Sequence, residues 1–306
     1  MAIDIASAQV KLRDLTAKFD NRVAAATPFY PQVCYDASSV RTSEKYGWIG
    51  NMPGMREWLG ERQFSELRAA NFVLENKHWE SSLLIKKTDL ADDNLGQYGP
   101  VLEQLGIEAA HHPDELWFSV LEQGESTACF DGQFFYDTDH VWGNSGSQSN
   151  DITSTVASTS APTVAEIKTA IRKMIRTMLA FKNDQGKLYN RPTVGRLNDL
   201  TLLVPLALRD LVYDALESEL ISNSSNVVVD RPNIVASPYL TSDVKLYLFK
   251  TGEAVKPFVF QRREPLTRMM KGIDDLETKD VKFMTEARYN VGYFAWWTSI
   301  LCTLTT

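Results

Sequence analysis

The side chains best suited to bind a metal ion lie in one short segment, Asp137-Thr138-Asp139-His140. Two carboxylates and an imidazole are groups that divalent cations accept as ligands. No second cluster in the sequence supplies the remaining ligands, and aspartates are also frequent in turns. Two interpretations stay open: a divalent-metal site in an oligomeric cytosolic α/β enzyme, or a polar turn. We expect the turn, no bound metal, and no loss when His140 is replaced by alanine.

Other chemically suggestive residues lack the spacing that their chemistry needs. Asp89, Asp92 and Asp93 lack the ordered glycine and spacing of a calcium loop, so Asp92 or Asp93 is expected to cap a helix instead. His111 and His112 are neighbours, and adjacent residues do not face the same way on a helix. The sequence has no nucleophile elbow, phosphate loop or dinucleotide-binding glycine pattern. We therefore expect no catalytic residue and no cofactor.

Composition is that of an ordinary globular protein. The chain has 306 residues, 44% of them hydrophobic and 23% charged, with a net charge of −7. Lys and Arg are scattered along the sequence, which argues against an electrostatic nucleic-acid binder. Cys34, Cys129 and Cys302 show no disulfide or zinc spacing, so reduced thiols are expected. No signal peptide and no apolar run of about 18 residues is present, so we expect no membrane partner.

Two extended runs, residues 71–75 and 78–86, flank a polar corner at Asn76-Lys77 and predict a long hairpin. Because no partner strand is obvious and a lone hairpin is unstable in water, we expect a neighbouring copy of the chain to cover it. Aromatic and apolar side chains are favoured where two surfaces pack tightly. The side chains expected to make such contacts between subunits, or else to lie in the core of their own domain, are Trp48, Trp58, Phe72, Leu74 and Trp79.

Helical periodicity marks several further elements. Residues 7–21 predict an amphipathic helix, which either lies on its own domain or reaches a neighbour. Residues 95–106 and 113–123 predict two helices, or one broken spine, interrupted near Pro113. Residues 163–182 predict a strong helix that begins with a capping box of Thr163 and Glu166. Short strands are expected at residues 200–205, 234–236, 245–249, 258–261, 281–284 and 289–298.

The order and spacing of several blocks resemble the major head subunit family of Mu-like phages over roughly residues 29–300. The blocks are Phe29-Tyr30, Tyr46-Gly47-Trp48-Ile49-Gly50, Met55-Arg56-Glu57-Trp58-Leu59-Gly60-Glu61-Arg62, Asn76-Lys77-His78-Trp79-Glu80, Asp92-Asp93-Asn94-Leu95-Gly96, Tyr136-Asp137-Thr138-Asp139-His140, Phe258-Val259-Phe260-Gln261-Arg262-Arg263-Glu264-Pro265 and Gly292-Tyr293-Phe294-Ala295-Trp296-Trp297. Each block alone is weak evidence for the family, whereas the joint order and spacing of the blocks are specific to it.

The resemblance implies an α+β protein with the HK97-like capsid fold. Its expected parts are an N-terminal arm (residues 1–40), an extended hairpin loop (41–88), a spine helix and peripheral domain (89–198), an axial domain (199–280) and closing peripheral strands (281–306). It also implies hexamers and pentamers of the chain in an icosahedral virion shell, assembled in the cytoplasm of a bacterial host. Its implied partners are a scaffold, a portal, in some cases a decoration protein, and enclosed double-stranded DNA.

Arg262 and Arg263 end a charged strand. An arginine fork pairs well with a carboxylate, so these residues are candidates for a salt bridge between subunits, with Glu103 or Asp274 as example partners. A solvated strand end is the alternative, and one exposed pair would contribute only ~0–1 kcal/mol.

Overall fold

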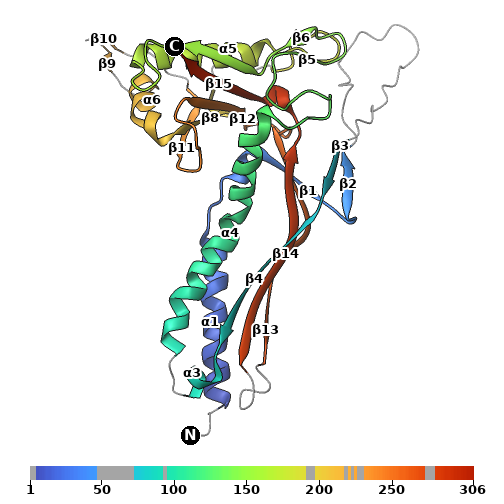
Figure 1. Ribbon diagram of the computed structural model, residues 1–306, viewed down its shortest axis with the longest axis vertical. Helices are drawn as coiled ribbons and strands as arrows, with labels where there is room; N and C mark the ends of the chain where they lie inside the picture. Colours follow the sequence, from blue (N-terminus) through green and yellow to red (C-terminus); the bar gives the residue numbers. More distant parts are fainter. Residues whose placement is uncertain are drawn as a thin grey trace.

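Two sheets of different shape divide the chain into a broad body and a long, narrow stalk (Figure 1). The computed structural model describes residues 5–46, 72–91, 95–190, 197–216, 220–221, 224–225, 231–272 and 280–306. Among these residues, no helix combines the length and apolar character needed to cross a lipid bilayer.

The body is built on a mixed five-stranded sheet. Its order is β11 (Asn233–Ser237), β8 (Leu200–Pro205), β12 (Lys245–Lys250), β15 (Ser299–Thr305) and β7 (Asp151–Thr155). All six residues of β8 are buried, as expected for a strand with partners on both sides and both faces covered. Helices α5 (Val164–Ala180) and α6 (Arg209–Leu216) contact each other, and α5 packs on β15 and β7. Sequence-distant segments therefore share one core.

Helix α5 confirms the prediction made from its sequence. Thr163 Oγ1 accepts a hydrogen bond from the backbone N–H of Glu166, and the Glu166 carboxylate accepts one from the Thr163 N–H at 2.7 Å. This reciprocal pairing satisfies N–H groups that the first helical turn leaves free. Its apolar stripe, including Ile167, Ile171 and Met174, is buried in the body.

The stalk consists of a four-stranded sheet covered by two helices. Its strands are β1 (Cys34–Ser38), β13 (Phe258–Lys271), β14 (Val281–Tyr293) and β4 (Lys77–Ile85), in that order. Helices α1 (Ile5–Ala25) and α4 (Tyr98–Glu122) run side by side along it (Figure 1). Their apolar faces meet the sheet in a cluster of Leu12, Phe19, Leu102, Ile85 and Phe283, all buried.

The expectation of an arm for residues 1–40 is wrong for the described part. Because its apolar face is covered by α4 and the sheet, α1 lies on its own chain, and β1 pairs in parallel with β13. Helices α1 and α4 approach so closely that a Cβ at Gly106 would lie 2.8 Å from the Phe19 carbonyl oxygen. Arg22 Nε donates to the Glu103 carboxylate at 2.9 Å on the same seam.

The spine is one helix and not two. Pro113 lies inside α4, and its buried side chain adds to the contacts that hold α4 in place. At its upper end α4 joins the body, where Glu122 accepts hydrogen bonds from the Thr241 N–H and hydroxyl at 2.8 and 2.7 Å. Helix α4 therefore connects stalk to body. The expected helix cap at Asp92 or Asp93 lies outside the described residues.

The predicted pairing of residues 71–75 with 78–86 is wrong. Strand β3 (Phe72–Glu75) pairs antiparallel with β2 (Ser43–Tyr46), and β4 pairs antiparallel with β14 along nine positions. The sequence shows that both runs are extended, but β14 is about 200 residues away along the chain. The projecting hairpin is therefore the β2–β3 ladder, and β4 belongs to the stalk.

The expected boundaries of the peripheral and axial domains are also displaced. Helix α5 and β7, expected in the peripheral domain, lie in the body with β8 and β12. Strand β13, expected in the axial domain, lies in the stalk sheet with β14. Strand β15 follows β14 in the sequence but lies in the body sheet. Pairing between distant strands, and not order along the chain, decides the division.

Shorter elements complete the described part of the structure. The helices are α2 (Tyr30–Val33) and α3 (Lys87–Ala91), and the strands are β5 (His140–Val141), β6 (Ser147–Gln148), β9 (Leu220–Ile221) and β10 (Ser224–Ser225). The 3-10 turns are Leu95–Gln97, Gln123–Glu125, Leu197–Asp199, Leu206–Leu208 and Trp296–Thr298.

Candidate assembly surfaces

Gln261 of β13 is a buried side chain that joins both strands of the projecting β2–β3 hairpin to the stalk, and Asn290 of β14 adds a bond from its Nδ2 to the Glu75 carbonyl oxygen at 2.8 Å. Gln261 Nε2 donates to the Leu74 carbonyl oxygen at 3.1 Å, and its Oε1 accepts from the Tyr46 hydroxyl at 2.8 Å. Burial raises the pKa of Tyr46 above its usual value, so this hydroxyl remains a donor at neutral pH. One amide therefore holds both strands of the hairpin. Nothing in the sequence singles out this glutamine, and the prediction missed it.

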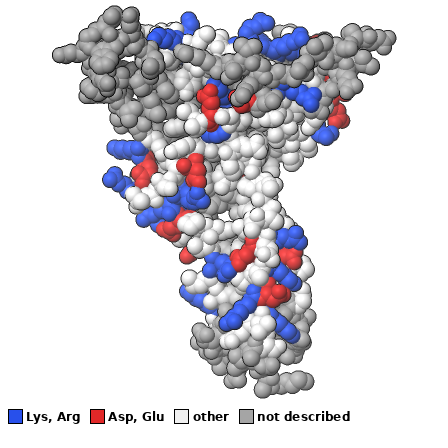
Figure 2. Space-filling model, turned by 180° about the vertical axis from the view of Figure 1, so that it is seen from behind, with Lys and Arg blue, Asp and Glu red and all other residues white. Residues whose placement is uncertain are grey.

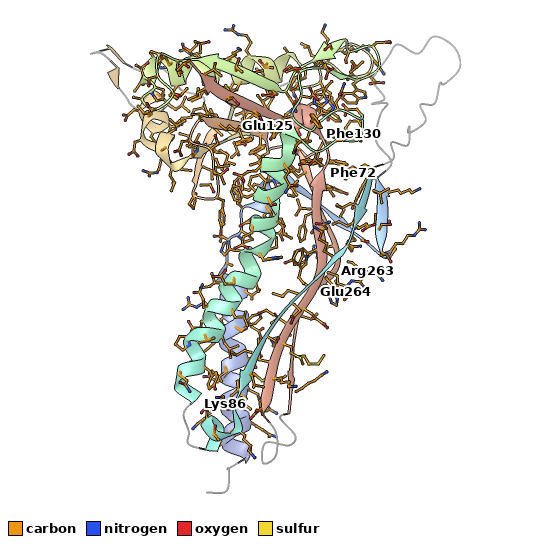
Figure 3. All side chains as sticks on the ribbon, viewed as in Figure 1. Phe72, Lys86, Glu125, Phe130, Arg263 and Glu264 are labelled. Atoms are coloured by element: carbon orange, nitrogen blue, oxygen red, sulfur yellow. The ribbon has the colours of Figure 1, made fainter. Side chains whose placement is uncertain are left out.

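Apolar contacts beneath the hairpin reinforce this attachment. Leu74 is buried against Ala37 and Val259, and Phe72 and Phe294 pack on the same cluster. Figure 3 places Phe72 at the root of the hairpin. Leu74 and Phe72 are therefore at least partly committed to their own chain.

Glycine at position 292 allows β14 to pack closely against Leu74 and Phe72 at the root of the hairpin. A Cβ there would lie 3.0 Å from Leu74 Cδ1 and 3.1 Å from the ring of Phe72. A side chain at this position would have to displace Leu74 and Phe72 by a few tenths of an ångström.

A polar corner sets the angle at which the hairpin leaves the stalk. Glu44 Oε1 accepts hydrogen bonds from the backbone N–H groups of Val40 and Arg41 at 3.0 and 3.1 Å. The Val40 N–H contributes most to lowering the pKa of this carboxyl. Asn76 Nδ2 donates to Ser39 Oγ and to the Arg41 carbonyl oxygen, both at 2.8 Å. The chain is thereby fixed where it turns from β1 into β2 and from β3 into β4.

Trp79 lies half-buried between the spine and the sheet. Its Nε1 donates to the Tyr289 carbonyl oxygen at 3.0 Å, and its ring meets His112 edge to face at 4.5 Å. The Tyr289 hydroxyl lies 2.7 Å from His112 Nδ1. Burial lowers the pKa of His112, which favours the neutral ring. The main contacts of Trp79 are therefore within its own subunit.

Arg262 and Arg263 also have partners in their own chain. Arg262 forms an ion pair with Asp36 of the neighbouring strand β1, and Arg263 Nε lies 3.8 Å from Glu264 on the outside of the stalk (Figure 3). Of the example partners, Glu103 is bound by Arg22, while Asp274 lies outside the described residues. Trp48 and Trp58 also lie outside them.

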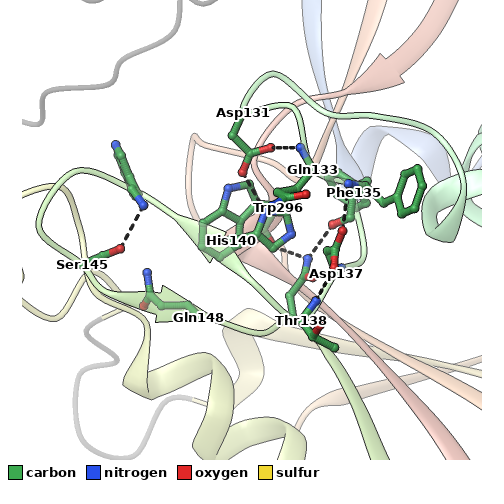
Figure 4. A network of polar contacts seen from close by, with 12 residues as sticks. Asp131, Gln133, Phe135, Asp137, Thr138, His140, Ser145, Gln148 and Trp296 are labelled. Atoms are coloured by element: carbon green, nitrogen blue, oxygen red, sulfur yellow. Dashed lines mark hydrogen bonds and ion pairs between the residues drawn. The ribbon is translucent and has the colours of Figure 1, made fainter.

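The segment Asp137-Thr138-Asp139-His140 does not gather into a metal site. Asp137 organises a turn by accepting hydrogen bonds from the N–H groups of Thr138 at 2.7 Å and Phe134 at 3.2 Å (Figure 4). His140 points away from it, with Nδ1 2.7 Å from Asp131 Oδ2. Across the described residues, no group of three or more His, Cys, Asp or Glu side chains is placed to hold a metal ion.

His140 lies in the core and not in the polar part of the turn. It is fully buried, and its ring stacks on Trp296 at 4.1 Å with an angle of 7° between the planes. His140→Ala would remove this buried ring and leave Asp131 without this partner, so a loss of stability is expected; the effect of the substitution on particle yield stays a prediction.

Comparison with known proteins gives this arrangement a context. The family described as "Mu-like prophage major head subunit gpT" matches residues 9–175, more than half of the chain. The chain belongs to this family. Within it, the chain is 39% identical to the Mu-like prophage FluMu major head subunit of Haemophilus influenzae, over 43% of each protein. It is 34% identical to the major capsid protein of Escherichia phage Mu, over 46% of each. The matched segment is thus less than half the length of these curated relatives.

Solved structures similar to this head-subunit family member include phage shells. The procapsid subunit of bacteriophage JBD30 is similar over 99% of this chain and 75% of its own, with a TM-score of 0.58 and 24% identity. The capsid subunit of Cyanophage P-SCSP1u is similar over 92% of this chain and 89% of its own, with a TM-score of 0.60 and 11% identity. At such identities the likeness shows the fold, which is the α+β HK97-like capsid fold expected from the sequence.

Proposed function

We propose that this chain is the major capsid protein of a Mu-like tailed phage and assembles with copies of itself into the shell of the virion. The observation that carries the proposal is the fold similarity to a procapsid subunit over 99% of the chain, together with membership of the head-subunit family. The JBD30 structures include a procapsid and capsids. A shell protein that assembles with copies of itself accounts for both the fold similarity and the family membership.

The shape of the molecule supports this role. A shell subunit needs a broad body to fill the centre of a ring of copies and an extension that contacts neighbouring subunits. The stalk and the projecting β2–β3 hairpin supply that extension (Figure 1). Many contacts of modest strength allow errors to be corrected, and closure of the shell then gains from multivalency.

The finer part of the proposal concerns partners. We expect hexamers and pentamers, a scaffold during assembly, a portal at one vertex, in some cases a decoration protein, and double-stranded DNA inside. Assembly would take place in the cytoplasm of the bacterial host. The alternative of a metal-dependent enzyme has no support, because Asp137 and His140 have different partners.

The experiment is assembly of the purified protein, followed by light scattering and negative-stain electron microscopy. Shells or rings of subunits are expected, and a protein that stays monomeric at high concentration contradicts the proposal. The matched variant removes residues 47–71 and joins Tyr46 to Phe72 through Asn-Gly. Tyr46 and Phe72 face each other in the β2–β3 ladder, so a two-residue turn can close the hairpin. The shortened protein should keep its fold and fail to close shells.

A further inference from the structure

A cavity of about 180 Å³ lies between α4 and the stalk sheet, beside β4, the last strand of that sheet. Small side chains line it from both layers, Ala109 from α4 and Ser81 and Ala287 from the sheet. It opens to solvent, because the exposed residues Glu108 and Glu115 also line it. Pockets that enclose a whole drug-sized ligand have volumes of ~300–1,000 Å³, so this smaller cavity can receive the end of a chain.

The charge around this cavity is negative. Elsewhere on the stalk, acidic and basic side chains lie side by side (Figure 2). The described residues that line the cavity include no lysine or arginine but four glutamates, at positions 80, 108, 115 and 286. Glu80 accepts a hydrogen bond from the Ser82 hydroxyl at 3.3 Å, and a Glu286 oxygen lies 3.9 Å from His78 Nε2. The two glutamates of α4 remain for a ligand.

Glu108 and Glu115 lie on either side of His112 along one face of α4, ~10 Å apart along the helix axis. Within the described part of the chain, Glu115 has no hydrogen bond or ion pair, and Glu108 accepts a hydrogen bond from the uncharged Gln104 side chain. Burial lowers the pKa of His112, and the charge of Glu115 opposes this shift. A neutral imidazole between two carboxylates leaves the cavity without a cation of its own.

Aromatic rings line the cavity as well, and they hold one another in place. Trp79 Nε1 donates to the Tyr289 carbonyl oxygen, and the Tyr289 hydroxyl lies at hydrogen-bond distance from His112 Nδ1. Burial raises the pKa of Tyr289, so its hydroxyl stays protonated at neutral pH. Rings that are already fixed lose little freedom when a ligand binds. Cations are attracted to aromatic ring faces, most strongly to tryptophan, so rings and carboxylates favour the same sign of charge.

We propose that this cavity binds the ammonium or guanidinium head of a flexible organic cation, placed between the ring of Trp79 and the carboxylates of Glu108 and Glu115. A divalent metal ion does not fit, because the described residues supply no group of three side chains able to hold one. Such a head belongs either to a lysine or arginine side chain of a neighbouring copy or to a free polyamine. The inference goes beyond the proposed function, because the subunit can be tested whether or not it forms shells.

The test follows the indole N–H signals of the purified, full-length subunit by NMR while Nα-acetylargininamide is added. The chain has seven tryptophans, and Trp79→Phe identifies the signal of Trp79. This signal should shift until the site is saturated. Nα-acetylcitrullinamide has the same shape with an uncharged urea in place of the guanidinium, so it should leave the signal unchanged. An equal shift with the citrulline compound, or no saturable shift with the arginine compound, overturns the proposal.

Removal of the two carboxylates gives a second measurement. Glu108→Gln with Glu115→Gln changes exposed positions and keeps good helix formers. One exposed ion pair changes affinity by up to about fivefold, so the double variant should bind roughly 2- to 30-fold more weakly. The matched control is Asp210→Asn with Asp214→Asn, which removes two exposed carboxylates from α6 in the body. Unchanged affinity in the glutamine variant, or an equal loss in the control, overturns the proposal.

Assembled shells distinguish the two sources of the cation. Radiolabelled spermidine that binds closed shells as tightly as it binds subunits indicates a free polyamine as the ligand. Loss of this binding in the shell indicates that a side chain of a neighbouring copy fills the cavity. Failure of the protein to form shells refutes the capsid function, whereas the titration of the subunit still decides whether the cavity binds a cation.

Discussion

Replacing Gln261 with leucine should loosen the projecting hairpin while leaving the rest of the fold intact. Leucine has a similar volume but neither donates to the Leu74 carbonyl oxygen nor accepts from the Tyr46 hydroxyl. An unsatisfied buried polar group costs about 1–3 kcal/mol, and the half-buried Tyr46 hydroxyl belongs at the lower end of that range. The attachment of the hairpin should weaken by about 2–4 kcal/mol.

Hydrogen exchange measured by mass spectrometry is the appropriate assay because it resolves local opening. A change of 2–4 kcal/mol corresponds to a roughly 30- to 700-fold loss of protection, since each 1.4 kcal/mol is tenfold. The loss should be confined to peptides that contain β2 and β3, and β8 should keep its protection. Shell yield should fall in parallel if the hairpin must be held at a fixed angle.

The control is Arg262→Gln on the next residue of the same strand. It breaks only the exposed ion pair with Asp36, so less than about 1 kcal/mol should be lost. Equal protection of β2 and β3 in the two variants would show that Gln261 does not anchor the hairpin.

Three further predictions concern stability. Thr163→Ala should destabilise the protein by about 0.5–2 kcal/mol in thermal unfolding, because it removes the N-cap of α5. Hydrogen bonds from Thr163 hold the pKa of the Glu166 carboxyl below its usual value. The stabilisation by the charged carboxylate is therefore complete above the unfolded pKa of about 4.3 and is lost as pH falls through the folded pKa. The difference in melting temperature between wild type and Glu166→Gln should therefore vanish at acid pH. Gly106→Ala should cost about 1–3 kcal/mol in urea unfolding despite alanine's helix propensity, because its Cβ collides with the Phe19 carbonyl, and a stabilised variant would contradict the packing of α1 on α4.

Local signals in the sequence were sufficient for several elements of the body. The capping box of Thr163 and Glu166 fixes the start of α5, and the apolar run of residues 200–205 matches β8 residue for residue. These elements are determined by neighbours in the chain. The capsid fold itself was predicted from the family resemblance, and composition alone indicated only a mixed globular protein.

Long-range pairing was beyond the reach of sequence reasoning. Periodicity marks β4 as extended but does not reveal β14 as its partner. The sequence therefore predicts, wrongly, that this strand belongs to a hairpin covered by a neighbouring copy of the chain. Pro113 predicts a break, yet α4 continues through it, held between α1 and the sheet. Gln261 carries no signal at all, because its importance arises only when β2, β3 and β13 meet.

The interleaving of the stalk has a consequence for synthesis of the protein. Strand β1 pairs with β13, and β4 with β14, so the early half of the chain supplies edges whose partners are translated last. A nascent polypeptide cannot complete this sheet until residue 293 has left the ribosome tunnel. Subunits still being translated on one message therefore lack a finished stalk, and under the proposed function we expect shell assembly to begin only after the chain is complete.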